Sequence, residues 1–341
     1  MDWLRRLRPD TYVLAILTMV GIASLLPVRG EVAVDFGFFT KLVIALLFFL
    51  HGARLSREAV IAGITHWRLH LLVLATTFVL FPLLGLAAQR LPEAILPQSL
   101  GIGVLFLCCL PSTVQSSIAF TSVARGNIAA AVCAASASNL FGIFITPVLI
   151  GLLMRGHGGG FSWDQVEAVV VQLLLPFLAG QISRRWLAGW IGRHGRLVSF
   201  VDRGSILLIV YGAFSDAVVQ GIWHKVSVLQ ILWLIGVCLA LLGIVLAFTA
   251  FASRSLGFSK EDEITIVFCG SKKSLASGVP MAGILFPAGH GGPNAGLLLL
   301  PLMIFHQLQL MACAVIAQRY AARPEARQPE VGTASGARRA Q

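Results

Sequence analysis

The stretch that most constrains this chain is residues 264–287, an apolar run of membrane-spanning length with Lys272 and Lys273 at its centre. A charge at mid-bilayer costs about 3 to about 17 kcal/mol, so both lysines are expected to face protein or a water-filled cavity. Gly270 and Pro280 weaken the surrounding helix, and peptide groups freed in a membrane are tolerated only where protein or a cavity surrounds them. The stretch therefore predicts a broken helix at a transport site. The alternative is a shorter helix whose lysines reach a headgroup layer.

Composition places the whole chain in a membrane. Of 341 residues, 57% are hydrophobic and 12% are charged, whereas soluble domains carry about 25% charged residues. The length allows roughly ten helices of about 20 residues each, with short loops. The net charge of +11 comes mostly from arginines and lysines in the predicted loops, so it indicates topology and no nucleic-acid partner.

Apolar runs and their polar boundaries predict an all-α integral membrane protein with ten transmembrane helices. The fourth span contains a polar interruption, residues 111–122, and the glycine-rich run 156–160 is expected to be an outer loop. The basic tail, residues 319–341, is expected to be disordered and cytoplasmic. The expected spans are residues 11–27, 36–52, 70–88, from Ser99 to a turn at 124–127, 128–154, 166–182, 205–221, 228–252, 264–287 and 295–318.

Basic residues set the expected orientation, because cytoplasmic loops carry the excess of lysine and arginine. With ten spans, the outer loops hold only Arg29, Arg90, Arg155 and Lys225, and nearly all other basic residues fall on the opposite side. The chain is therefore expected to be a multi-pass protein of the plasma (inner) membrane with both termini in the cytoplasm.

The two interrupted spans occupy equivalent places, the fourth of the first five and the fourth of the second five. Residues 115–119, QSSIA, align with residues 272–276, KKSLA, although short serine-rich matches also arise by chance. Five spans per half is an odd number, so the halves must insert in opposite orientations. This predicts two inverted five-helix repeats, residues 1–155 and 156–318, whose discontinuous helices, spans 4 and 9, cross near the midplane.

Three segments carry a resemblance to a known family. Residues 110–149, LPSTVQSSIAFTSVARGNIAAAVCAASASNLFGIFITPVL, resemble spans four and five of the bile-acid:sodium symporter superfamily. Residues 270–283, GSKKSLASGVPMAG, and residues 300–310, LPLMIFHQLQL, resemble its divergent sodium-bile-acid-cotransporter-like (SBF-like) branch. The resemblance implies a panel domain of spans 1, 2, 6 and 7 and a core domain of spans 3–5 and 8–10. It also implies that the broken helices cross at the substrate and ion site.

The first sodium site implied by the resemblance is incomplete here. The family's Ser-Asn pair falls near Ser116 and Ser117, and its span-five hydroxyls fall at alanines beside Ser136. Phe268 stands near the place of the family's acidic ligand. Of the ligands that the resemblance implies, only Ser116, Ser117 and Ser136 remain as a candidate sodium site.

The second implied sodium site has lost both of its glutamines. Thr77 stands near one of them, and Lys272 stands in the place of the other. An ammonium cannot ligate sodium, and beside a vacant cation site it supplies the positive charge itself. The coupling ion is therefore expected to be H+ or Na+, and no cofactor is expected.

Three functions remain open. The first is a secondary active transporter of an organic anion, in which Lys272 or Lys273 pairs with the substrate or carries a proton in place of sodium. The second is a sodium-coupled organic-anion symporter with a relocated ion site, which requires both lysines to turn away from the crossing. The third is a non-transporting membrane regulator. Metalloid export, which another branch performs with a cysteine, is not expected because Ser112 stands there.

No enzyme is expected, because the sequence has no nucleophile-base-acid set and no phosphate-binding loop. The expected partners are a small organic anion and the lipid bilayer, and the sequence predicts no oligomeric state. The polar cluster at His306, Gln307 and Gln309 either reaches the cavity or bonds backbone freed by Pro301. The residues expected to bind substrate or ion are Thr77, Ser112, Thr113, Gln115, Ser116, Ser117, Ser136, Ser138, Asn139, Ser271, Lys272, Lys273, Ser274, His306 and Gln307.

Overall fold

A computed structural model describes residues 11–54, 66–154, 170–219, 221, 226–286 and 295–323, which contain helices and no strand, as the predicted all-α class requires. The predicted loop at 156–160 and most of the predicted tail lie outside these residues. The elements are α2 (Thr11–Leu25), α3 (Glu31–Arg54), α5 (Trp67–Ala75), the π-helical turn η1 (Thr76–Leu80), α6 (Phe81–Ala88), α7 (Gln98–Cys109), α8 (Val114–Val123), α9 (Ile128–Leu153), the π-helical turn η2 (Val170–Leu174), α11 (Leu175–Arg193), α12 (Gly195–Val219), α14 (Val228–Ser255), α15 (Lys260–Gly270), α16 (Leu275–Leu285) and α17 (Ala295–Ala321).

Several of these helices are long and apolar enough to cross a membrane. Within the described residues, length and hydropathy identify six spans, and a seventh if α7 and α8, bent by 65°, form one broken span. Helices α15 and α16 are not among these candidate spans, and α2 is too short to be one of them. The six are Glu31–Arg54, Trp67–Ala88, Ile128–Leu153, Gly195–Val219, Val228–Ser255 and Ala295–Ala321.

Some helices extend beyond the ends that hydropathy predicts. The predicted sixth and seventh spans, 166–182 and 205–221, leave Arg184, Arg185 and Arg203 in the loop between them. In the structure Arg184 and Arg185 lie inside α11, and Arg203 lies inside α12. Similarly, α17 continues to Ala321, three residues into the predicted tail. Hydropathy falls at the first charge, whereas the helix continues because arginine is a good helix former whose head reaches water along an apolar stem.

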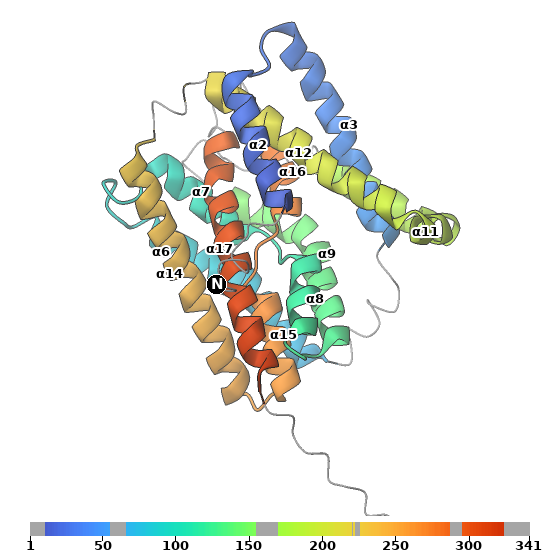
Figure 1. Cartoon of the computed structure of the whole chain (residues 1–341), viewed down its shortest axis with the longest axis vertical. Coiled ribbons are helices and arrows are strands. Elements are labelled where there is room, and N and C mark those ends of the chain that lie inside the picture. The colour runs from blue at the N-terminus through green and yellow to red at the C-terminus, as the bar shows by residue number, and fades with distance from the viewer. Residues whose placement is uncertain are drawn as a thin grey trace, which may run out of the picture.

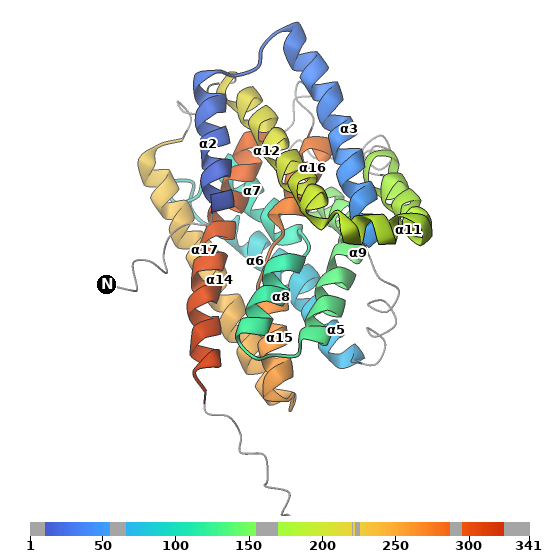
Figure 2. The same cartoon turned by 45° about the vertical axis from the view of Figure 1, so that its right-hand side comes forward.

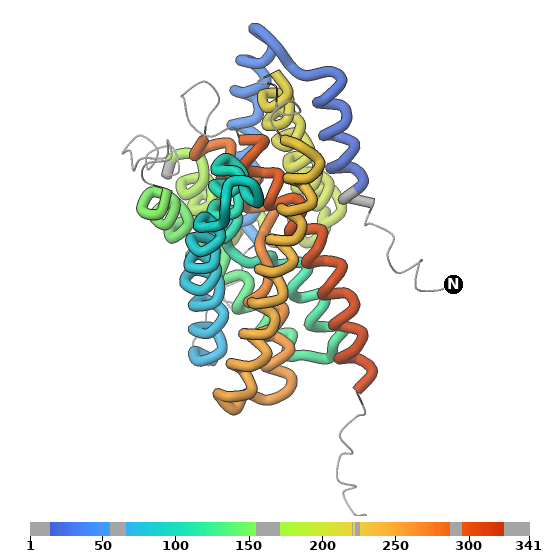
Figure 3. Tube along the Cα trace, turned by 90° about the vertical axis from the view of Figure 1, so that its left-hand side faces the viewer, coloured from blue at the N-terminus to red at the C-terminus, as the bar shows by residue number. Residues whose placement is uncertain are grey.

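Two groups of helices pack against each other. Helices α2, α3, α11 and α12 contact one another, and α12 joins this group to α16 and α17. The second group contains α5 to α9 and α14 to α17, and Figures 1 and 2 show it below and beside the first. In Figure 3, α14 lies between the α5–α6 segment and α17, both of which it contacts.

The turn between α8 and α9 fixes one end of the second group. Arg125 adopts a left-handed conformation with φ of 57°, and Asn127 then caps α9 by accepting from the Ala130 N–H at 3.0 Å. The amide of Asn127 also donates to Asp262 at 2.9 Å, and its carbonyl accepts from the Thr265 hydroxyl at 3.0 Å. The turn at residues 124–127, which lies in the segment that resembles the symporter superfamily, thus bonds to the start of α15.

Glycines allow α3 and α11 to approach at backbone distance. A Cβ on Gly52 would lie 2.0 Å from the Phe177 carbonyl oxygen, and a Cβ on Gly180 would lie 2.0 Å from that of Phe49. Small residues permit such close helix contacts in membranes, where dispersion and packing drive association.

We expect Gly52→Ala to destabilise the α3–α11 contact by about 1–3 kcal/mol, because the new methyl group meets a backbone carbonyl that cannot rotate away. Gly37→Ala is the matched control in the same helix, since nothing lies within 4 Å of its Cβ position. The measurement is the Tm of each purified variant in detergent. Equal Tm values for the two variants would contradict this packing.

Candidate functional site

Both broken helices are interrupted for four residues, and the two interruptions contact each other. We name residues 110–113 break 1 and residues 271–274 break 2. The Ser274 N–H donates to the Pro111 carbonyl at 2.9 Å, and the Thr113 hydroxyl donates to the Lys273 carbonyl at 2.9 Å. Figure 1 shows α7 above α8 but α15 below α16, so the two broken helices run in opposite directions where they meet.

The helix starts correct the sequence alignment of the two breaks. Residues 115–119 lie inside α8, whereas Lys272 and Lys273 precede the start of α16. Matching the helix starts aligns Val114 with Leu275, which differs by four residues from the alignment of QSSIA with KKSLA. Local sequence similarity therefore paired positions that are not structurally equivalent.

Side chains from α9 hold break 1 in place. The Ser112 N–H donates to the Ser138 hydroxyl at 3.0 Å, and the Asn139 amide donates to the Ser112 carbonyl at 2.7 Å. The Thr146 hydroxyl donates to the Cys109 carbonyl at 2.8 Å. Asn139 also accepts from the Ser277 hydroxyl at 2.7 Å, so one amide bonds to both broken helices.

The ammonium of Lys273 is enclosed by backbone carbonyls. Its Nζ donates to the carbonyls of Thr77 at 2.8 Å, Cys108 at 2.7 Å and Leu110 at 2.7 Å, and it lies 4.1 Å from the centre of the Phe81 ring. The side chain is 0% exposed. An ammonium has three N–H donors, so these three bonds use all of them.

Local backbone structure explains why these carbonyls are available. In the π-helical turn η1, the Phe81 N–H donates to Thr76 rather than Thr77, and the next residue, Pro82, has no N–H. The Thr77 carbonyl therefore lacks a helical donor. The Cys108 carbonyl is one of the last in α7, where carbonyls have no N–H donor from the same helix. The Ser112 N–H, which would bond it if the helix continued, donates to the Ser138 hydroxyl instead.

Lys272 has a different environment from its neighbour. Its Nζ donates to the Ser116 carbonyl at 2.8 Å and lies 3.9 Å from the centre of the Phe120 ring and 5.5 Å from that of Phe268. This is a cation–π contact with a single carbonyl bond. Among the described residues, no ion pair involves Lys272 or Lys273, and both are 0% exposed.

Gln309 connects break 2 to His306. Its Oε1 accepts from the Lys273 N–H at 2.8 Å and its Nε2 donates to the Lys273 carbonyl at 2.9 Å, which fixes the orientation of the amide. The same Nε2 lies 2.9 Å from Nδ1 of His306. Since Nε2 is a donor, Nδ1 must accept, and the imidazole is neutral with its proton on Nε2.

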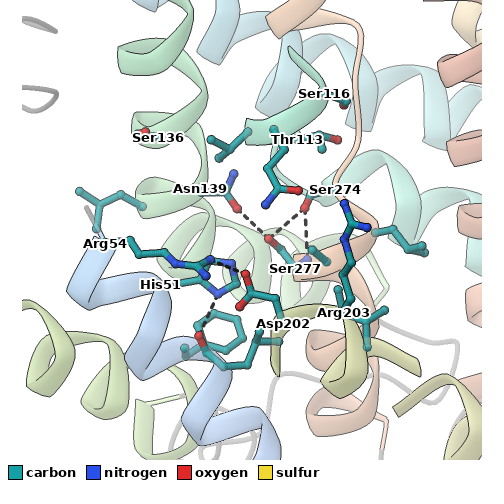
Figure 4. Close-up of a pocket in the computed structure, with 18 of the residues that line it drawn as sticks. His51, Arg54, Thr113, Ser116, Ser136, Asn139, Asp202, Arg203, Ser274 and Ser277 are labelled. Atoms are coloured by element: carbon teal, nitrogen blue, oxygen red, sulfur yellow. Dashed lines mark hydrogen bonds and ion pairs between the residues drawn. The ribbon is translucent and has the colours of Figure 1, made fainter. Parts of the chain in front are cut away.

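A cavity of about 670 Å³ lies between the two helix groups, next to the breaks. Its wall on the side of the second helix group includes the first residues of α8 and of α16, with Ser136 and Asn139 from α9. Its opposite wall includes Leu47 and Phe48 of α3 and Phe177 of α11. Figure 4 shows Asn139, Ser274 and Ser277 facing the polar residues of this opposite wall.

Four ionisable residues of that opposite wall were not predicted as site residues. Arg54 forms an ion pair with Asp202, His51 bonds the Leu47 carbonyl at 2.9 Å, and Arg203 also lines the cavity. Figure 4 shows Arg54, His51 and Asp202 grouped together with Arg203 beside them. The sequence reading assigned both arginines to cytoplasmic loops, and only the helical extension of α3 and α12 reveals that they line the cavity.

Comparisons with known proteins identify the family of this chain. Residues 10–322 match the model of the SBF-like CPA transporter family. The chain belongs to the SBF-like CPA transporter family. A Pseudomonas aeruginosa protein of uncharacterised function is 56% identical, over 93% of this chain and 95% of its own length. The Escherichia coli protein named "Putative symporter YfeH" is 54% identical over 91% and 92%, and the rat protein named "Sodium/bile acid cotransporter 7" is 30% identical over 93% and 94%.

Membership of the SBF-like family makes this chain a membrane transporter-family protein and not an enzyme.

The predicted site residues divide into two sets. Those that line the cavity are Thr113, Gln115, Ser116, Ser136, Asn139, Ser274 and His306. Those absent from its lining are Thr77, Ser112, Ser117, Ser138, Ser271, Lys272, Lys273 and Gln307.

The second set bonds mainly to the backbone of the broken helices. Ser112 donates to the Cys269 carbonyl at 2.6 Å, Ser117 to that of Phe268 at 3.1 Å, and Ser271 to that of Val267 at 2.6 Å.

The sodium site left by the resemblance does not fit this SBF-like chain. The Ser117 hydroxyl donates to the Phe268 carbonyl, which does not use its lone pairs, but the Lys272 ammonium bonds the Ser116 carbonyl at 2.8 Å. A cation bound at Ser116, Ser117 and Ser136 would lie beside that positive charge, with no carboxylate among the three residues. The relocated-site hypothesis also requires both lysines to turn away from the crossing, but both ammonium groups bond to carbonyls of the first broken helix or its neighbour.

The two lysines predict different stability losses. Lys273→Met leaves three buried carbonyls without a donor, and each such group costs about 1–3 kcal/mol. Lys272→Met frees one carbonyl and keeps an apolar chain against Phe120 and Phe268. We expect the Tm of Lys273→Met to fall well below that of Lys272→Met, measured on purified protein. The reverse order would show that the carbonyl contacts are not what holds Lys273.

Proposed function

We propose that this chain is a ten-span transporter built from two inverted repeats. In this arrangement the spans are α2, α3, α5–η1–α6, α7–α8, α9, η2–α11, α12, α14, α15–α16 and α17. The group α2, α3, α11 and α12 is the panel domain and the remaining helices are the core domain. Two observations favour this arrangement: both breaks are four residues long, and the broken helices run oppositely where they meet.

We propose that the transported substrate is an organic anion that binds in the cavity between the two domains. The starts of α8 and α16 both line it, and a helix start carries a partial positive charge that favours anions. Of the described ionisable residues that line it, two are arginines, two are histidines and one is the carboxylate Asp202. The apolar residues around them suit an amphipathic anion, which agrees with the name of the rat relative.

Two buried polar atoms at the cavity wall also favour a bound ligand. Asp202 Oδ1 and Ser116 Oγ are buried, and neither has a hydrogen-bond partner within the part of the chain that the structure describes. Buried polar groups are nearly always satisfied by protein, water or ligand. Asp202 Oδ1 needs a donor and the Ser116 hydroxyl can donate to an anion, so we infer that the substrate carries a hydrogen-bond donor besides its negative charge.

The coupling ion in this proposal is the proton. His306 lines the cavity, is neutral in the geometry described, and is bonded through Gln309 to break 2. A proton added to Nδ1 removes the acceptor for Gln309, so protonation changes the contact with break 2. The orientation we propose, with both termini cytoplasmic in the inner membrane, follows the distribution of basic residues. A non-transporting regulator gains no support from a cavity of this chemistry.

Taurocholate, a sulfonated bile salt, is a suitable probe of the proposed anion site. We expect saturable uptake into proteoliposomes, with a KM that rises about tenfold or more in Arg203→Gln, because a charge-assisted bond contributes about 1.5–3 kcal/mol. Arg196→Gln is the control, since Arg196 belongs to the same helix but is not among the residues that line the cavity. Uptake that does not saturate, or equal KM values for the two variants, would refute the assignment.

Proton coupling predicts a second difference. An inward proton gradient is expected to stimulate uptake by the unmodified protein, whereas a sodium gradient of the same size has no effect. His306→Gln keeps an amide oxygen that can accept from Gln309 but cannot be protonated, so the response to the proton gradient should be lost while taurocholate binding remains. Stimulation by sodium alone would favour the sodium-coupled alternative.

A further inference from the structure

The carbonyl cradle around Lys273 has the chemistry of a monovalent-cation site. Backbone carbonyl oxygens are the ligands that proteins use to replace the hydration shell of such ions. The cradle presents three of them, from Thr77, Cys108 and Leu110, at 2.7–2.8 Å from one point, and the face of the Phe81 ring closes it. The C-terminal end of α7, which contributes Cys108, adds the negative end of its dipole.

The protein builds this cradle from parts that are unfavourable in a membrane without a cation. A π-helical turn followed by Pro82 exposes the Thr77 carbonyl, and break 1 exposes those of Cys108 and Leu110. Unpaired carbonyls are costly in hydrocarbon. The Lys273 ammonium, a cation, bonds all three of these carbonyls. Elsewhere in the same region a neutral hydroxyl is enough for one carbonyl, as Thr146 shows for Cys109.

We propose that Lys273 is a tethered cation: its ammonium permanently occupies a monovalent-cation site at the crossing of the two broken helices. The site therefore needs no dissolved ion, and truncating the side chain turns it into a site that takes K+ or Na+. Lys272 differs because its ammonium has one carbonyl and two aromatic rings around it, which do not coordinate an alkali ion. This inference refines the ion site of the proposed transporter, but its test requires no transport, so the two proposals can fail separately.

The test compares Lys273→Ala with Lys272→Ala by thermal unfolding of the purified full chain. Each is measured in KCl, NaCl and N-methyl-D-glucamine chloride at equal ionic strength, and with added n-propylammonium, which replaces the missing part of the side chain. For Lys273→Ala we expect a Tm below that of the unmodified protein and an upward, saturating shift with K+ or Na+, because binding to the folded state stabilises it by mass action. For Lys272→Ala we expect no difference between the alkali and N-methyl-D-glucamine salts.

The unmodified protein provides an arm that does not depend on variant folding. Its Tm is expected to be the same in all three salts, since the ammonium already occupies the cradle. A higher Tm of the unmodified protein in KCl or NaCl would reveal a vacant ion site and overturn the proposal. A Lys273→Ala Tm that is insensitive to alkali ions and to n-propylammonium, or equal alkali shifts in both variants, would also overturn it.

Discussion

The structure depends on the hydrogen bonding of peptide groups released where two helices stop inside an apolar region. No water is available there to replace a lost backbone bond, so each exposed carbonyl needs a protein donor. Break 1 satisfies this requirement with side chains from other elements: Thr146 bonds Cys109, Asn139 bonds Ser112, and Lys273 bonds Cys108 and Leu110. The polar residues that appear out of place in the sequence are therefore largely the donors of this network.

This requirement changes how the lysine pair is understood. The sequence predicts that both lysines face protein or a water-filled cavity, because a charge in the bilayer is costly, and the first functional hypothesis pairs one of them with the substrate or a proton. Neither lysine is among the residues that line the cavity. The partners of the Lys273 ammonium also lie outside that lining, whereas the Lys272 ammonium contacts Ser116 and Phe120, which both line the cavity. The C-terminal end of α7 holds the Lys273 ammonium, while the N-termini of α8 and α16, at Val114 and Leu275, line the cavity. In the proposed transporter, the Lys273 ammonium and the anionic substrate therefore lie at opposite ends of half-helices.

Much of the architecture followed from hydropathy and from residues that do not belong in a lipid-facing helix. The two interruptions were predicted because Lys272, Lys273 and the Ser-rich run after Pro111 cannot lie in lipid. Three features were beyond the reach of the sequence. Arg54 and Arg203 looked like loop charges because hydropathy ends before a helix does. The π-helical turn at Thr76–Leu80 has no reliable sequence signal, although Pro82 indicates where a carbonyl loses its donor. The alignment of the two breaks depends on where α8 and α16 begin. The five-residue similarity of QSSIA and KKSLA gives an alignment that differs by four residues from the one that matches these helix starts.

The cavity and the cation cradle are connected by direct contacts, and this connection gives a physical route for coupling. His306 lines the cavity and bonds Gln309, which in turn holds both peptide groups of Lys273, whose ammonium closes break 1. Asn139, which also lines the cavity, bonds the Ser112 carbonyl of break 1 and Ser277 of α16. A ligand that displaces Asn139 therefore alters hydrogen bonds to break 1 and to α16, and one that displaces His306 alters the contact of Gln309, which bonds break 2. Because the freed carbonyls must remain bonded in the membrane, such a change favours a concerted rearrangement of the two broken helices over the local loss of one bond.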